Sequence, residues 1–175
     1  MHTLHWWAVK AEDEQEAFGR VKDRLINEDG TNWIDWSDWH VVGGGRWSKS
    51  QYEDSSDMII SFKNQPEKFM EQLAQCRKFR TEEIHRYMTE MNTDKFISDI
   101  VDYISNGGLP NDSQRFSMNS WVIKKAADLL GDSYCPESYF FDLDEYTAHM
   151  GYLLERLDKT EDSKLQYLVP IDFHF

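Results

Sequence analysis

The sequence predicts an α+β fold built as a single domain over residues 1–175. Three observations predict it. Short apolar runs typical of strands stand near both ends of the chain, and stretches with helical apolar spacing lie between them. Aromatic residues make up 14% of the sequence, and a chain of 175 residues is long enough to bury them in a core.

The first third of the chain predicts one helix and three strands. Over residues 4–9 the side chains of Leu4, Trp6 and Ala8 alternate with those of His5, Trp7 and Val9, as in a strand. A helix with acidic residues in its first turn follows over 13–26. A short strand over Trp39–Val42 runs into three consecutive glycines at 43–45. The apolar run MIISF at 58–62 predicts a buried strand.

The middle of the chain, residues 66–131, predicts helices only. Pro66 suits the first turn of a long helix, whose apolar stripe is interrupted by Arg80. Thr93 can cap a second helix with its apolar residues on one face, and residues 120–130 predict a third. This part of the chain is therefore expected to be a helix-rich elaboration of the core.

The last third returns to strands. Residues 139–143 predict a strand, 145–157 a helix and 165–175 a final strand. The whole order favours one mainly antiparallel sheet with helices on one side, and a ferredoxin-like core would fit it. In that arrangement both ends of the chain meet in the same sheet.

Charge is distributed unevenly along the chain, whose formal net charge is −13. Residues 1–60 carry 6 basic and 12 acidic side chains, residues 61–130 carry 10 of each, and residues 131–175 carry 3 and 10. Such a surface repels phosphate backbones, which argues against direct nucleic-acid binding, and it favours a protein partner with a basic surface. Acidic runs such as DLDE at 142–145 could imitate DNA phosphates, although solvated loops explain them equally well.

The cellular setting predicted by the sequence is a reducing cytoplasm. Cys76 and Cys135 are the two cysteines, and their spacing resembles neither a zinc knuckle nor a redox pair. The first residues lack the basic and apolar regions of a secretion signal, and no apolar run reaches the length of a membrane span. No cofactor or metal is predicted, and the oligomeric state stays open.

Two motifs resemble the signatures of a family of uncharacterised bacterial and phage proteins, whose members carry an Asp-Trp, a Val-Gly-Gly-Arg-Trp and a terminal Asp-x-His. The motifs are DWHVVGGGRWS at 38–48 and LVPIDFHF at 168–175. The residues that fall on the pattern are Asp38, Trp39, Gly44, Gly45, Arg46, Trp47, Asp172 and His174. The resemblance covers both ends of the chain but not the middle, and the third glycine departs from the usual pair. It implies a phage or prophage origin and no known activity.

The glycine-rich segment is the first candidate site. Gly43, Gly44 and Gly45 can approach a ligand closely, and Arg46 could hold a phosphate or carboxylate. Three tryptophans that could stack on a base lie nearby, namely Trp36, Trp39 and Trp47. The segment is neither a Walker A motif nor a dinucleotide fingerprint. The alternative is structural: the glycines form a bulge or tight crossing, and Arg46 pairs with Asp38 or Asp172.

The histidines are the second candidate. Asp172 and His174 share one face of the last strand, and His5 or His40 on adjoining strands could join them in a metal or acid–base site. No catalytic motif accompanies them. Histidines that only form hydrogen bonds within a polar sheet face are the alternative.

Three functions follow from these features. The favoured one is a non-enzymatic acidic protein, encoded by a phage, that acts as a host-takeover or anti-defence inhibitor by docking on a host protein. A nucleotide binder or sponge at Gly43–Trp47 is the second. A phosphoesterase or nuclease-like enzyme that uses Asp172 and His174 is the third.

Overall fold

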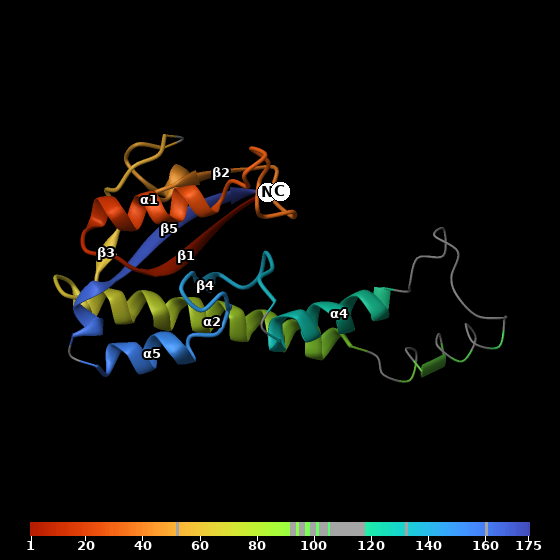
Figure 1. The fold of residues 1–175 in the computed structure, drawn as a ribbon. Coiled ribbons are helices and arrows are strands. Elements are labelled where there is room, and N and C mark those ends of the chain that lie inside the picture. The colour runs from red at the N-terminus through yellow and green to blue at the C-terminus, as the bar shows by residue number, and fades with distance from the viewer. Residues whose placement is uncertain are drawn as a thin grey trace.

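The computed structural model describes residues 1–51, 53–91, 118–131, 133–159 and 161–175, with single positions at 94, 97, 98, 101 and 105. The elements along the chain are β1 (His2–Lys10), α1 (Glu14–Arg24), β2 (Trp39–Val42), the 3-10 turn η1 (Gly45–Trp47), β3 (Ile60–Ser61), α2 (Pro66–Glu90), α4 (Met118–Leu130), β4 (Phe140–Asp142), α5 (Gly151–Leu157), the 3-10 turn η2 (Asp162–Leu165) and β5 (Gln166–His174). The α+β prediction is confirmed (Figure 1).

The sheet has the strand order β2-β5-β1-β4, with β3 also pairing with β5. Only the β1–β4 pair is parallel, so the prediction of a mainly antiparallel sheet is confirmed. β1 and β5 pair along their whole lengths, from His2 opposite His174 to Lys10 opposite Gln166. The two ends of the chain therefore lie side by side, as expected and as Figure 1 shows.

The helices cover both faces of the sheet, which corrects the expectation that they lie on one side. α1 lies on one face, where its Val21 joins a core cluster with Trp7 of β1, and α2 and α5 lie on the other (Figure 1). There Phe69 of α2 and Leu153 of α5 pack with Trp6. The central strands explain the difference: Trp6 and Trp7 are consecutive and both buried, so each face needs a cover.

The strand order also differs from the expected ferredoxin-like core. In a ferredoxin-like βαββαβ arrangement the second and third strands form a hairpin. Here β2 and β3 do not pair with each other; each pairs with β5, at 171–174 and at 167–168 respectively. Pro170 stands between these two registers, and its carbonyl oxygen accepts the Gly43 N–H at 2.7 Å. A proline fits this central strand because its missing N–H faces the gap between two edge strands.

The fifth helix is shorter than predicted. α5 begins at Gly151 rather than at 145, because Asp142 and Thr147 exchange backbone hydrogen bonds across a turn in which Tyr146 has φ of 54°. The helix predicted from Thr93 lies largely outside the described residues.

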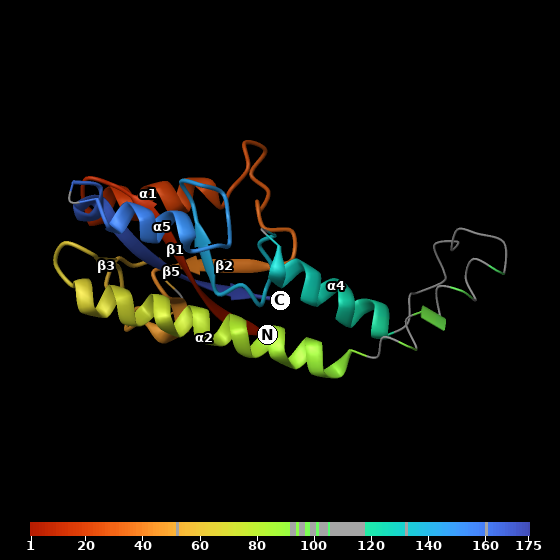
Figure 2. The same cartoon turned by 90° about the horizontal axis from the view of Figure 1, so that it is seen from below.

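The middle of the chain forms two packed helices. The C-terminal half of α2 and α4 run beside each other beyond the end of the sheet (Figures 1 and 2). Tyr87 of α2 packs with Val122 and Leu129 of α4. Arg80 interrupts the apolar stripe because its guanidinium group donates to the carbonyl oxygens of Leu129 and Gly131 at the end of α4. No helix among the described residues combines the length and apolar character needed to cross a bilayer.

Candidate functional site

Four aromatic side chains from both ends of the chain meet where β1, β5 and β2 end beside one another. His174 of β5 lies directly opposite His2 of β1 and Trp39 of β2, so the three side chains share one face of the sheet. Trp47 reaches the same place from η1. We call His2, Trp39, Trp47 and His174 the aromatic patch.

The rings of the patch pack directly on one another. Trp39 and His174 are stacked, with centroids 5.1 Å apart and ring planes at 9°. The His2 ring stands edge-on to both, at 5.2 Å from Trp39 and 5.0 Å from His174, and lies 6.4 Å from Trp47. Despite this packing, Trp39 is 37% exposed and Trp47 44% exposed. The patch is thus ordered by its own contacts and open to solvent.

Asp172 lies beneath the patch and holds it together. Its side chain has no exposed surface. One carboxylate oxygen lies 2.9 Å from Nδ1 of His2, and the other accepts the backbone N–H of Arg46 at 3.0 Å. A buried carboxylate needs such partners, because an unpaired one would be costly to desolvate. Asp172 therefore fixes His2 and the start of η1 together.

The three glycines allow η1 to cross closely over β5. All three have positive φ, at 99°, 98° and 47°. A Cβ atom on Gly45 would lie 2.4 Å from a carboxylate oxygen of Asp172, and one on Gly43 would lie 1.6 Å from the carbonyl oxygen of Ser55. Any larger residue would meet protein atoms at these positions. The segment has the geometry of a tight crossing, and Asp172 occupies the place that a ligand anion would take beside Arg46 N–H.

Arg46 does not form the ion pair expected from the sequence. Its backbone N–H, rather than its guanidinium group, binds Asp172. The guanidinium carbon lies 5.8 Å from the centre of the Trp47 ring, and the side chain forms no ion pair with a described residue. Arg46 is exposed, so its charge is available at the border of the patch.

Asp38 is the acidic neighbour of the patch. Its backbone N–H donates to the carbonyl oxygen of His174 at 2.8 Å. Its carboxylate lies 3.4 Å from Nδ1 of His174, which is an ion-pair distance if the imidazole is protonated but leaves Nδ1 without a hydrogen bond. The Asp38 side chain is 73% exposed, so it also faces solvent.

Three residues predicted to join the site lie on the opposite face of the sheet. Trp36 packs against Phe173, with ring centroids 4.9 Å apart, and is half-buried. His40 lies opposite Phe173 in the ladder, and burial lowers its pKa. His5 is fully buried, and its pKa falls to about 3 because of burial, although its bond to the Pro136 carbonyl acts in the other direction. The structure thus separates these side chains from Asp172 and His174.

His2 is the member of the site that sequence reasoning missed. The signal was present, because β1 alternates and His2 shares a face with Leu4 and Trp6. What could not be read from the sequence is the register that places His2 opposite His174.

The side chains of the patch offer contacts for a bound molecule. Two indole rings and a guanidinium group offer apolar, stacking and cation–π contacts. Among the described residues, no three His, Cys, Asp or Glu side chains are placed to hold a metal ion.

Comparison with known proteins finds no matching family model, no similar curated protein and no similar solved structure. The resemblance to the phage family stays a prediction from the two motifs.

Proposed function

We propose that this protein is a non-enzymatic binding protein that docks on a partner protein through the aromatic patch and Arg46. One observation carries the proposal: Trp39 and Trp47 are 37% and 44% exposed on either side of His2, and a buried carboxylate holds His2 and the start of η1. Tryptophan and arginine dominate the binding energy of protein interfaces. A rigid support lowers the entropy lost when such side chains bind.

The charge of the chain supports a partner with a basic surface. The net charge is −13, and the exposed carboxylate of Asp38 borders the patch. Opposite charges speed association and favour the matching partner, and their effect weakens as salt screens them. Arg46 adds one positive charge at the border, which would pair with an acidic group of the partner.

The enzymatic alternative has less support. A phosphoesterase or nuclease would need Asp172 and His174 to reach a substrate. The Asp172 side chain has no exposed surface, and both of its oxygens have protein partners. A substrate would have to break these contacts first.

The nucleotide alternative is weakened in the same way. The backbone N–H groups of Gly43, Arg46 and Trp47 already donate to Pro170, Asp172 and Gly44 respectively. A phosphate could reach them only by displacing these acceptors.

The setting we propose is the cytoplasm of a bacterial host, with the protein acting as a phage-encoded takeover or anti-defence inhibitor. This part rests on the two motifs at 38–48 and 168–175 and their resemblance to phage proteins. The aromatic patch is formed by these same motifs together with His2, so the resemblance and the geometry point to one surface.

The experiment is affinity capture from host lysate with the wild-type protein and with a Trp39→Ala, Trp47→Ala double variant. We expect the wild-type protein to retain one partner and the variant to lose it. With the purified partner, the double variant should raise Kd at least about 100-fold, since two interface tryptophans are removed. The wild-type Kd should also rise with salt.

The matched control is Tyr152→Ala, because Tyr152 is an aromatic residue that is 55% exposed on α5, away from the patch. Its binding should equal that of the wild-type protein. Unchanged binding by the folded double variant would refute the proposed surface.

A further inference from the structure

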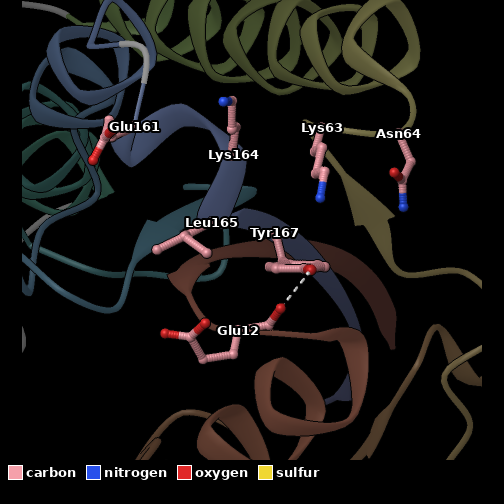
Figure 3. Close-up of a pocket in the computed structure, with 7 residues that line it drawn as sticks. All are labelled: Glu12, Lys63, Asn64, Glu161, Lys164, Leu165 and Tyr167. Atoms are coloured by element: carbon pink, nitrogen blue, oxygen red, sulfur yellow. Dashed lines mark hydrogen bonds between the residues drawn. The ribbon is translucent and has the colours of Figure 1, made fainter.

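A polar pocket lies at the other end of β5 from the aromatic patch. It has a volume of about 330 Å³, which is at the small end of the range of ligand sites. Tyr167 and Leu165 form its apolar part, and side chains from the β3–α2 loop, η2 and the chain before α1 surround them (Figure 3). The pocket is therefore formed by three separate segments of the chain, since η2 continues directly into β5.

Backbone hydrogen bonds fix the segments that form this pocket. Ala11 N–H donates to the carbonyl oxygen of Leu165 and Phe62 N–H donates to that of Gln166, both at 2.9 Å. Tyr167 is only 6% exposed, and its hydroxyl group donates to the carbonyl oxygen of Glu12 at 3.4 Å. The pocket is thus preformed rather than dependent on loop closure.

Four charged side chains line the pocket without forming ion pairs. Lys63, Lys164, Glu12 and Glu161 all contribute to the lining, yet none of them pairs with another described residue. Elsewhere nearby the charges are matched, since Lys10 lies 2.7 Å from Asp162. Two charges of each sign therefore face one small space and do not neutralise each other directly.

Three of the four charged side chains are grouped by sign, and Lys164 lies between the two groups. Figure 3 shows Lys63 and Asn64 on one side of Tyr167, and Glu161 and the Glu12 carboxylate on the other, with Lys164 between them. A purely anionic ligand would meet the two carboxylates, and a polyamine would meet the two lysines. A molecule with one charge of each sign would satisfy both sides.

We propose that this pocket binds a small zwitterion, namely a free α-amino acid. Its carboxylate would lie toward Lys63 and Asn64, and its ammonium group toward Glu12 and Glu161. Its side chain would pack on Leu165. This inference is independent of the aromatic patch.

The test is saturation-transfer NMR on the full chain with an equimolar pool of the common protein amino acids, followed by titration calorimetry with the best binder. We expect saturable binding of at least one amino acid. Its amide, which lacks the carboxylate, and its N-acetyl form, which lacks the ammonium group, should each bind about tenfold more weakly.

The variants Lys63→Gln and Glu12→Gln should each weaken binding of the free amino acid about tenfold. Lys49→Gln is the matched control, because Lys49 is exposed, unpaired among the described residues and not part of the pocket, and it should leave binding unchanged. The inference is overturned if no member of the pool binds, if the amide and N-acetyl forms bind as well as the parent, or if the pocket variants bind as the wild type does.

Discussion

His2 and His5 belong to the same strand, yet they lie on opposite faces of the sheet and in opposite surroundings. His5 is fully buried among Trp36, Tyr134 and Phe173. His2 is partly exposed and lies among rings that reach solvent. Both faces are rich in aromatic side chains, so the residue types alone do not distinguish them.

The polar partners show what separates the two faces. On the buried face, Trp7 Nε1 donates to the Tyr134 hydroxyl oxygen at 2.8 Å, and the Tyr134 hydroxyl lies 2.6 Å from His5 Nδ1. His5 Nε2 lies 3.0 Å from the carbonyl oxygen of Pro136, which can only accept, so Nε2 carries the proton and Nδ1 accepts from Tyr134. The polar side-chain atoms of Trp7, Tyr134 and His5 are therefore all paired inside the protein. On the open face the Asp172 carboxylate binds His2 and the Arg46 N–H, while Trp39 and Trp47 remain 37% and 44% exposed.

The largest effect is expected at the crossing that supports the open face. Gly45→Ala puts a methyl group within 2.5 Å of Asp172 at a φ of 47°. Overpacking and the strained backbone should together lower the free energy of unfolding by about 3 kcal/mol or more. Urea unfolding of the purified variant measures this.

Gly19→Ala is the matched control for that variant. Gly19 lies inside α1, and a Cβ there would meet nothing within 4 Å. Alanine favours the helix, so this variant should gain up to about 1 kcal/mol. Equal effects of the two substitutions would mean that η1 does not cross β5 as closely as described.

The next effect concerns the buried face. Tyr134→Phe removes the hydroxyl group and leaves Trp7 Nε1 and His5 Nδ1 without their partner. Two unsatisfied buried atoms should lower the free energy of unfolding by about 2–3 kcal/mol. Tyr152→Phe, at a side chain that is 55% exposed, should change it by less than about 0.5 kcal/mol. A Tyr134→Phe variant as stable as the wild type would show that this network adds no stability.

The two faces also show which features of the structure could be predicted from the sequence. The strands were predictable, because period-two runs and turn residues are local signals. The mainly antiparallel sheet and the meeting of both ends of the chain in it followed from the predicted order of strands and helices. Strand register is not local, and it decides that His2 rather than His5 or His40 lies beside Asp172. Trp6 and Trp7 are consecutive apolar residues on opposite faces of β1, and this pair is the sequence signal for a sheet that is covered on both faces.

His5 should make the free energy of unfolding depend on pH, and substitution of His2 should leave this contribution in place. Unfolded His5 takes up a proton below its usual pKa of 6.5, whereas the folded protein keeps it neutral down to about pH 3. Between these values the unfolded state binds one more proton, so the free energy of unfolding falls as pH falls, by up to about 1.4 kcal/mol per pH unit from this group. His5→Gln should remove this contribution from urea unfolding curves measured between about pH 4 and pH 7.

His2→Gln provides the comparison on the open face. It should keep the His5 contribution, because the two rings lie on opposite faces of β1. If His5→Gln and the wild-type protein lose stability in parallel as pH falls, His5 is not held neutral in the folded state.

The smallest effect is expected at the border of the patch. Asp38→Asn removes a carboxylate that lies 3.4 Å from His174 and is 73% exposed. Solvent screens such a pair, so the free energy of unfolding should change by no more than about 0.5 kcal/mol. The backbone bond from Asp38 N–H to His174 remains in the variant.

Asp35→Asn is the matched control. It removes the same charge at an exposed residue with no ion pair among the described residues, and its free energy of unfolding in urea should match that of Asp38→Asn. If Asp38→Asn alone lowered the free energy of unfolding by more than about 1 kcal/mol, Asp38 would support the fold. The polar groups of the open face would then be paired inside the protein, as those around His5 are.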